Sequence, residues 1–388
     1  MPKILGYAHQ SVDDADISAV AAVLDADYLT TGPRVEQFEK MLCEMTGAEH
    51  CIACANGTAA LHLACMALGV GKDDIGLTSP ISFLASANCI EYCGAKADFV
   101  DIDPGTLCLS PQQLEAYCRA HKPPKVVIPV DFAGLGADLA AMAELSKTYG
   151  FLLIEDAAHA LGSFYQADGK QYACGSCGHT DLAVFSFHPV KTITTGEGGA
   201  VMTNDRSLAD RVRSLRNHGM ESHADLIEQH GGWAYEMTHL GFNYRITDIQ
   251  CALGISQLSR LDEFRHQRRQ IVSKYNDAFS KHEDLLLPNQ NLALTACPHL
   301  YPIRLKAGAA KRRQVYERLK ADNIFCQVHY IPIYRQPYYA DKYSYEKGRC
   351  PQAERYYSQT LSLPLFPAMS DHDVLRVIEQ FLIALDND

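Results

Sequence analysis

The chain has 388 residues, of which 47% are hydrophobic and 21% charged, a balance that excludes a disordered or fibrous protein. This length predicts two domains, or one large domain with a smaller one attached. The formal net charge of −11 argues against a nucleic-acid partner and against docking on an anionic membrane, because both need clustered Lys and Arg.

No apolar run reaches the roughly 18 residues that a membrane-spanning helix needs, so we expect none. The N-terminal sequence, Met-Pro-Lys-Ile-Leu-Gly-Tyr, lacks the apolar core of a signal peptide. We therefore expect a cytoplasmic protein, in which the 14 cysteines are free thiols and not a disulfide framework.

Two helices are predicted before residue 50, over 16–24 and 34–45, and Pro33 leads into the second. From 50 to 217, short apolar runs alternate with helical patterns. The predicted strands are 50–54, 75–79, 97–101, 125–130, 151–155, 182–187 and 199–203, and the predicted helices between them are 58–69, 84–93, 111–121, 138–149 and 208–216. Strands without polar alternation are buried on both faces, which indicates an α/β fold with a mainly parallel sheet.

The pattern changes after residue 245. One long helix or two joined helices are predicted over 247–275, strands over 299–305 and 325–329, and a last helix over 371–385. These elements are typical of a smaller α+β domain. The predicted domains are therefore a large α/β domain, 1–250, which includes the N-terminal helices, and a small C-terminal domain, 251–388.

Three pairs of cysteines have spacings that also occur in metal sites, and the third is followed by a histidine in a Gly-rich loop. A structural zinc site needs four ligands, usually from two such motifs. Free cysteine is also among the most buried residue types. We therefore predict no metal, although the last cluster leaves that alternative open. The sets are Cys51 with Cys54, Cys89 with Cys93, and Cys174 with Cys177 and His179.

Two charged residues follow neighbouring predicted strands. Asp156 comes directly after 151–155, and Lys191 follows 182–187. Alone, the first would be read as a helix cap and the second as a solvated charge. Ligands of parallel sheets bind at the carboxyl ends of the strands, so we expect both side chains at one crevice. A lysine opposite a carboxylate suits a Schiff base with pyridoxal phosphate, in which the carboxylate keeps the pyridine nitrogen protonated.

Residues around these two could hold the rest of such a cofactor. Asn-Gly-Thr-Ala-Ala (56–60) opens a helix after the first strand, so its free N–H groups and the Thr58 hydroxyl would bind a phosphate. Ser186 could supply a further hydroxyl. Phe83 could stack on the ring face, but it fits a core position equally well.

Eight motifs in register along the chain resemble the DegT/DnrJ/EryC1/StrS sugar aminotransferases, a branch of the fold-type-I pyridoxal phosphate enzymes. Each motif alone is weak, but the ordered set is specific. The motifs are Leu-Thr-Thr-Gly-Pro (29–33), Asn-Gly-Thr-Ala-Ala-Leu (56–61), Ile-Ser-Phe-Leu-Ala-Ser-Ala-Asn (81–88), Glu-Asp-Ala-Ala-His-Ala (155–160), Phe-Ser-Phe-His-Pro-Val-Lys (185–191), Gly-Glu-Gly-Gly (196–199), Gly-Phe-Asn-Tyr-Arg (241–245) and Gln-Val-His-Tyr-Ile-Pro-Ile-Tyr (327–334).

The resemblance implies roles for the cofactor residues. Lys191 matches the lysine that carries the cofactor and shuttles the proton, and Asp156 the partner of the pyridine nitrogen. His159 matches a residue near the phenolic oxygen of the ring. Asn243 matches a residue that reaches the phosphate from the partner subunit, although some relatives place it where this chain has Arg245. The matching phosphate ligands are Thr58, Ala59 and Ser186, and the matching stacking residue is Phe83.

The resemblance also implies a substrate and a dimer. Within the family the chain is most similar to transaminases of pseudaminic acid biosynthesis, which implies transfer of an amino group from L-glutamate to C4 of a UDP-4-keto-6-deoxy-N-acetylhexosamine. The active sites would be shared within a homodimer. Candidate substrate contacts are Tyr7, Arg34, His329 and Tyr330.

Three other functions remain open. A sibling aminotransferase would act on another keto sugar, such as a dTDP-hexose or a UDP-4-keto-pentose. A pyridoxamine-dependent sugar dehydratase is disfavoured, because that branch of the family has His where this chain has Lys191. A regulatory protein that only binds the cofactor would need a further domain, and none remains after the 388 residues are assigned.

Overall fold

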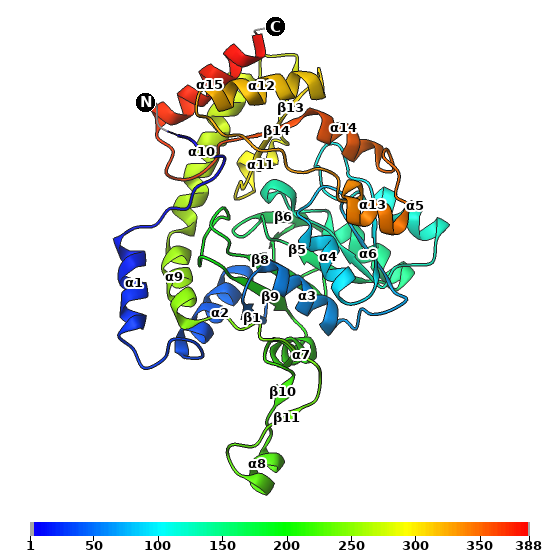
Figure 1. The fold of residues 1–388 in the computed structure, drawn as a ribbon, viewed down its shortest axis with the longest axis vertical. Helices are drawn as coiled ribbons and strands as arrows, with labels where there is room; N and C mark the ends of the chain where they lie inside the picture. Colours follow the sequence, from blue (N-terminus) through cyan, green and yellow to red (C-terminus); the bar gives the residue numbers. More distant parts are fainter. Residues whose placement is uncertain (1–3, 387–388) are drawn as a thin grey trace.

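A seven-stranded sheet forms the centre of the computed structural model, which describes residues 4–386 (Figure 1). Its strand order is β1-β9-β8-β5-β4-β2-β3. Only β9 is antiparallel to its neighbours, and the pairs from β8 to β3 are parallel. The strands are β1 (His50–Cys54), β2 (Ile75–Thr78), β3 (Lys96–Phe99), β4 (Val126–Ile128), β5 (Leu152–Asp156), β8 (Leu182–Ser186) and β9 (Gly199–Thr203). The predicted α/β fold with a mainly parallel sheet is confirmed.

Helices cover this sheet, and each predicted helix is present with its ends shifted by at most two residues, except at 247–275. There the chain forms two helices, α9 and α10, and the second continues to Phe279. The helices of this part are α1 (Asp14–Leu24), α2 (Pro33–Thr46), α3 (Gly57–Ala67), α4 (Ala85–Tyr92), α5 (Pro111–Ala120), α6 (Leu139–Tyr149), α7 (Arg206–Arg216), α9 (Asp248–Ser259) and α10 (Leu261–Phe279), with a 3-10 turn, η1 (Phe132–Gly134).

Polar side chains fix several helix starts. The carboxylate of Asp13 accepts N–H groups at the start of α1, and Thr247 with Gln250 forms a capping box at the start of α9. Asn56 caps α3 by accepting the N–H of Ala59 at 2.8 Å. This cap holds the first turn of α3 immediately after β1.

The carboxyl ends of three strands meet at one edge of the sheet. Cys54 of β1 and Ser186 of β8 both pair with Gly199 of β9. β5 runs parallel to β8, with Asp156 opposite Val184. The end of β8 also lies close to α3, because a Cβ built on Gly57 would lie 2.8 Å from Cβ of Ser186. Asp156, Ser186 and the first turn of α3 therefore lie at the same edge.

A second hydrophobic cluster lies beyond the sheet. It includes Leu5, the C-terminal half of α10 and the sheet β12-β13-β14, together with α12 and α15. The elements of this region are β12 (Leu285–Leu286), α11 (Asn291–Leu294), β13 (Tyr301–Leu305), α12 (Ala309–Ala321), η2 (Ile333–Arg335), α13 (Pro337–Tyr343), α14 (Pro351–Gln359), β14 (Thr360–Leu363) and α15 (Asp371–Asp386). We propose a domain division near the predicted position after residue 250, which falls inside α9.

One predicted strand is wrong. Residues 325–329 form no strand and make only an isolated pairing between Gln327 and Ser362. The backbone groups of Gln327 and Ser362 bond to each other at 3.2 and 2.7 Å, but Phe325 bonds to Leu5 instead. The segment thus changes partner before a ladder can form, and it continues into the wall of a cavity.

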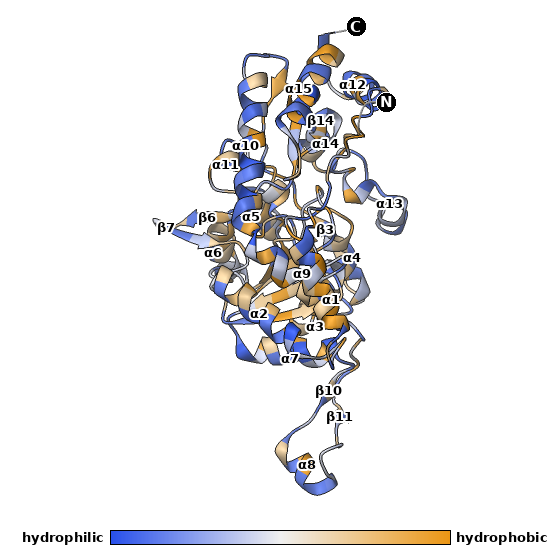
Figure 2. Cartoon of the chain, turned by 90° about the vertical axis from the view of Figure 1, so that its left-hand side faces the viewer, coloured by the Kyte–Doolittle hydropathy of each residue, from blue (hydrophilic) through white to orange (hydrophobic). Residues whose placement is uncertain are grey.

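Two hairpins were not predicted. β6 (Phe164–Ala167) and β7 (Lys170–Ala173) are joined by Asp168 and Gly169, both with positive φ. The second hairpin, β10 (Met220–Glu221) and β11 (Glu236–Met237), carries α8 (Ala224–His230) and extends away from the body as an arm, residues 218–240 (Figures 1 and 2).

The arm exposes large apolar side chains, and Trp233 is 81% exposed. The others are Ile227, Tyr235, Met237 and Leu240. Figure 2 shows that apolar residues otherwise gather on the strands and on the inner faces of the helices. Among residues 4–386, no helix combines the length and apolarity needed to cross a bilayer.

Candidate active site

A cavity of about 900 Å³ opens at the carboxyl edge of the sheet. Its walls come from the ends of β5 and β8, the starts of α3 and α4, and the segment 327–331. It brings together ten of the twelve residues predicted for the site: Tyr7, Thr58, Ala59, Phe83, Asp156, His159, Ser186, Lys191, His329 and Tyr330. These residues are spread over more than 300 positions of the sequence.

Asp156 lies buried at the floor of this cavity. The Ser86 hydroxyl donates to its Oδ2 at 2.7 Å, and the N–H of Ala158 donates to its Oδ1 at 3.2 Å. Burial raises the pKa of this carboxyl, whereas Ser86, Ala158 and the charge of Lys191 act in the opposite direction. Each oxygen holds one donor and keeps room for another, so the group can accept a proton-bearing nitrogen of a ligand.

Lys191 lies half-buried across the cavity from the β5 strand end. Burial lowers the pKa of its ammonium group to about 8, and the attraction of Asp156 opposes this shift. A substantial fraction of the Lys191 side-chain amine is therefore neutral near pH 8, and the neutral amine can act as a nucleophile. The backbone of the loop is held by the fully buried Arg268 of α10, whose guanidinium donates to the carbonyl of Lys191 at 3.5 Å and to that of Leu365 at 3.0 Å.

The first turn of α3 forms an anion cradle. Among the described residues, no hydrogen bond engages the backbone N–H groups of Gly57 and Thr58 or the hydroxyls of Thr58 and Ser186, and all face the cavity wall. The helix dipole adds positive potential at this end. Because a Cβ on Gly57 would collide with Ser186, only glycine lets the turn approach β8 this closely. Together with Asp156 and Lys191, this cradle fits pyridoxal phosphate.

Two histidines of the cavity, His159 and His329, are neutral. Burial, and then the charges of Lys191 and His329, hold the pKa of His159 well below its usual range. Burial lowers the pKa of His329 to about 3. His329 Nδ1 lies 2.9 Å from the Ser362 hydroxyl, and His159 Nε2 lies 3.4 Å from the hydroxyl of Tyr330. Both rings can therefore accept or donate hydrogen bonds without bringing charge into the site.

Phe83 is 57% exposed and lines the cavity, so the alternative that it is a core aromatic is wrong. Tyr7 comes from the N-terminal segment, and its ring centroid lies 5.1 Å from that of His329. The apolar ring of Phe83 and the hydroxyl-bearing ring of Tyr7 thus line the same cavity from different segments of the chain.

Two predicted residues lie away from this cavity. The Arg34 guanidinium bonds to Gln37 at 2.8 Å on the exposed side of α2. Asn243 is exposed, and its backbone pairs with Asn217 at the base of the arm, although its neighbour Tyr244 lines the cavity. Arg245, the alternative for that role, donates to the Asn217 side chain at 2.6 Å.

Sequence reasoning missed Ser86 as the partner of Asp156. Its hydroxyl lies 2.7 Å from that of Ser82, which lies in the loop before α4, so two serines lead to the carboxylate. Both lie in the motif 81–88, four residues apart on either side of the start of α4. That spacing was the available signal.

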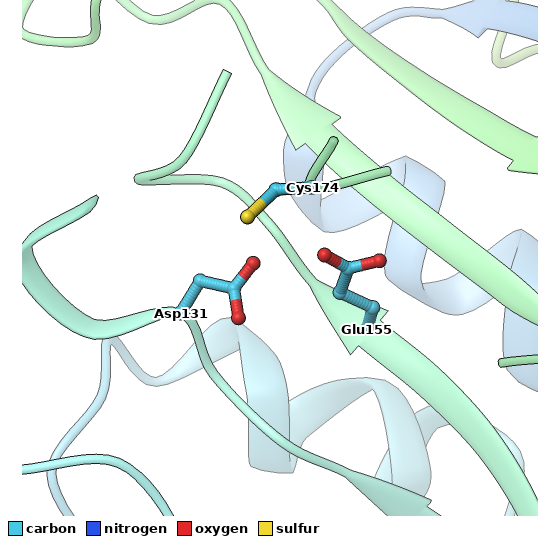
Figure 3. Close-up of side chains that lie close together, drawn as sticks. All are labelled: Asp131, Glu155 and Cys174. Atoms are coloured by element: carbon cyan, nitrogen blue, oxygen red, sulfur yellow. The ribbon is translucent and has the colours of Figure 1, made fainter. Parts of the chain in front are cut away.

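The Cys-x2-Cys-x-His cluster does not converge. The thiol of Cys177 donates to the carbonyl of Met202 at 3.2 Å, and His179 Nδ1 lies 2.9 Å from the hydroxyl of Tyr165. Cys174 instead points toward Asp131 and Glu155, and the ligand atoms of these three lie within 4.8 Å of one another (Figure 3). The absence of a metal stays a prediction.

Two buried carboxyls, those of Asp131 and Glu155, lie next to the end of β5 that carries Asp156. Asp131 Oδ1 accepts the N–H of Ala137 at 2.8 Å, and Glu155 accepts that of Gly175 at 3.0 and 3.1 Å. Asp131 Oδ2 is buried and has no hydrogen-bond partner among residues 4–386. Burial raises both pKa values, that of Asp131 to about 6, and the charge of Asp131 raises that of Glu155 further. At neutral pH the pair therefore holds a proton.

Glu155→Gln is expected to leave the melting temperature at pH 7 nearly unchanged, because the amide replaces the shared proton as donor and the net charge stays the same. Glu155→Ala should lower the free energy of unfolding by roughly 3–5 kcal/mol, since it leaves a buried carboxyl without its partner.

The pH dependence of stability gives a second test of the shared proton. The raised pKa values of the pair stabilise the fold below about pH 4, and this stabilisation is lost as pH rises through about 6. The melting temperature of Glu155→Gln should therefore fall less between pH 4 and 8 than that of the parent protein; equal slopes would contradict the shared proton.

The fold and the cavity define a pyridoxal phosphate enzyme of fold type I. Solved structures are similar over nearly the whole chain. PseC from Helicobacter pylori, an aminotransferase involved in the biosynthesis of pseudaminic acid, matches with a TM-score of 0.91 and 30% identity over 99% of this chain and 100% of its own. The PLP form of Spr1654 from Streptococcus pneumoniae matches with a TM-score of 0.89 and 26% identity over 99% of both chains.

The chain belongs to the DegT/DnrJ/EryC1/StrS aminotransferase family, which it matches over residues 10–382. It is 38% identical to the spore coat polysaccharide biosynthesis protein SpsC of Bacillus subtilis, over 97% of this chain and 95% of that protein. It is also 38% identical to the UDP-4-amino-4,6-dideoxy-N-acetyl-beta-L-altrosamine transaminase of Campylobacter jejuni strain 81-176, over 99% and 98%. The protein is thus a pyridoxal phosphate-dependent sugar aminotransferase, and the resemblance seen in its motifs is confirmed.

Proposed function

We propose that this aminotransferase moves an amino group from L-glutamate to C4 of a UDP-4-keto-6-deoxy-N-acetylhexosamine, the reaction expected for pseudaminic acid biosynthesis. The similarity to the Campylobacter transaminase over 99% of the chain carries this proposal. The cavity of about 900 Å³ lies near the upper end of the range for ligand pockets, so it has room for a cofactor and a sugar. The proposed location is the cytoplasm.

The cavity residues receive the following roles in this proposal. Pyridoxal phosphate supplies an electron sink for the carbon that loses its proton. Lys191 carries the cofactor and moves that proton, and Asp156 holds the proton on the pyridine nitrogen. His159 would lie near the phenolic oxygen of the cofactor, and Phe83 would stack on its ring. Thr58, Ala59 and Ser186 bind the phosphate, while Tyr7, His329 and Tyr330 contact the substrate.

A panel of nucleotide keto sugars tests the proposal. Purified protein would be incubated with glutamate and UDP- or dTDP-linked 4-keto hexoses and pentoses, and the products identified by mass and NMR. We expect amination at C4 of the UDP-4-keto-6-deoxy-N-acetylhexosamine. The similarity to SpsC favours a second candidate, another keto sugar, and preferential amination of a different panel member would select it.

We further propose that two copies of the chain share their active sites. Among residues 4–386, Lys191 is the only Lys or Arg that lines the cavity, so the cavity offers little charge for a pyrophosphate within one chain. Asn243 and Arg34 are exposed, which leaves both available to a second copy. The apolar side chains on the arm next to Asn243 are typical of a surface that another chain covers.

Mixed dimers test this arrangement. Lys191→Ala and Asn243→Asp should each be badly impaired as pure dimers, the second because a carboxylate would face the phosphate. If Asn243 acts across a two-fold interface, a heterodimer has one site with both lesions and one site with neither. Two affinity tags would isolate it, and its activity should approach half that of the parent dimer. A heterodimer no more active than the better pure dimer would mean that Asn243 acts within its own chain, and Arg245 would be tested next.

A further inference from the structure

A second cavity, of about 290 Å³, lies between the two hydrophobic clusters. Its walls come from the loop after β3, from β12 and β13, and from α14. It shares no lining residue with the large cavity. The residues that line it are Ile102, Pro104, Gly105, Leu107, Leu286, Arg304, Gln352, Arg355 and Tyr356.

Of the residues that the structure describes, two arginines and no acidic residue line this second cavity. Neither Arg304 nor Arg355 has a carboxylate oxygen within 4.0 Å among residues 4–386. Arg335 and Arg349 of the same region, by contrast, both pair with carboxylates. The two guanidiniums therefore leave positive charge at the cavity wall that the protein does not neutralise by direct pairing.

The guanidinium of Arg304 is held by one hydrogen bond but has a buried N–H donor without an acceptor among the described residues. Its Nη1 donates to the carbonyl of Pro104 at 3.3 Å, while its Nε is buried and has no hydrogen-bond partner in the described chain. Burial, and then the charge of Arg355, lower the pKa of Arg304, although Tyr356 opposes the shift. A buried guanidinium donor without an acceptor is costly, and an anion in the cavity would supply the acceptor.

Three acidic residues adjacent to lining residues in the sequence are engaged elsewhere. Glu354, next to Arg355, accepts from the Tyr334 hydroxyl at 2.8 Å and from Arg335 at 3.2 Å. The Asp101 carboxylate accepts the N–H groups of Gln352 and Ala353 at the start of α14, at 2.8 and 2.9 Å. Asp103 accepts the N–H groups of Gly105 and Thr106 at 2.9 and 2.8 Å. The carboxylates of Asp101 and Asp103 thus hold the walls together instead of closing the cavity.

We propose that this second cavity binds a small organic oxyanion, with its carboxylate or phosphate group between Arg304 and Arg355. A guanidinium fork matches either group in a bidentate way. Ile102, Leu107 and Leu286 offer apolar contacts for a short carbon skeleton. The volume lies at the lower end of the range for ligand pockets, so the occupant is a small metabolite and not a nucleotide sugar.

Binding of two probes to the holoenzyme tests the proposal. Isothermal titration with glutarate and with inorganic phosphate would be compared between the parent protein and Arg304→Gln/Arg355→Gln, with Arg313→Gln, an exposed arginine of α12, as the matched control. We expect at least tenfold weaker binding of one probe to the double variant and unchanged binding to the control. The probe that binds more tightly identifies a carboxylate or a phosphate as the natural group. Equal affinities in the parent and the double variant would overturn the proposal.

A separate experiment tests where the anion binds, because either probe could also enter the large cavity. Crystals of the holoenzyme soaked in selenate should show an anomalous peak within hydrogen-bond distance of Arg304 and Arg355. A peak only in the large cavity, or none, would overturn the proposal. If the double variant does not fold, Arg355→Gln alone serves, since that side chain is exposed and its loss leaves the core intact.

Discussion

Lys191→Ala is expected to abolish transamination, with a loss of at least roughly 10³-fold, because in the proposed mechanism this one side chain would both attach the cofactor and transfer the proton. The low pKa of this amine, about 8, is what a covalent attachment near neutral pH needs. The variant should also lose the visible absorbance of the bound cofactor. It can still hold the cofactor by its phosphate, since the donors of the α3 turn remain.

Borohydride reduction and peptide mass mapping give the decisive measurement. In the parent protein the cofactor mass should map to the peptide that contains Lys191. Lys170→Ala is the matched control, because that lysine is exposed on β7 and lies outside the cavity. Cofactor mass on a peptide without Lys191, or a colourless control, would refute the assignment.

The edge of the sheet that carries the site could be predicted from the sequence. Uniformly apolar strands indicate a buried parallel sheet, and such a sheet brings the residues after its strands to one edge. Asp156, Ser186 and Lys191 follow this rule and line one cavity. The argument needs only strand direction, which the helices between successive predicted strands indicate. β9 follows β8 without an intervening helix and runs antiparallel to it.

Contacts between distant segments could not be predicted in this way. Ser86 reaches Asp156 across 70 positions, and the ring of His299 lies 4.4 Å from that of His159. Such pairs depend on how α4 and the second hydrophobic cluster pack against the sheet, and no periodicity in the sequence reports that packing. The same holds for Cys174, which faces Asp131 and Glu155 and not its neighbours in the sequence.

The β6–β7 hairpin, in contrast, had a signal that went unused. Asp168 and Gly169 both adopt positive φ, at 51° and 71°, as an Asp-Gly turn between strands requires. The arm is different, because its strands are only two residues long and its apolar side chains are exposed. Neither strand periodicity nor a buried face marks it in the sequence.

Asp156→Asn is expected to slow both half-reactions by roughly 10²–10³-fold, while cofactor affinity falls much less. The asparagine keeps the shape and can still accept the bonds from Ser86 and Ala158. It loses the negative charge that would keep a pyridine nitrogen protonated, so the ring withdraws electrons less strongly from the reacting carbon.

Two further variants separate charge from geometry at this position. Ser86→Ala removes one donor at 2.7 Å that stabilises the charged form of Asp156, so its already raised pKa should rise further. The acid limb of the pH–rate profile should then move to higher pH, because Asp156 must be ionised to hold the ring proton. Asp156→Asn should show no such limb, since it has no carboxyl to titrate. Single-turnover rates with glutamate across this pH range measure both effects; near-normal turnover in Asp156→Asn would show that the carboxylate does not hold the ring nitrogen, and an unshifted limb in Ser86→Ala would show that the limb belongs to another group.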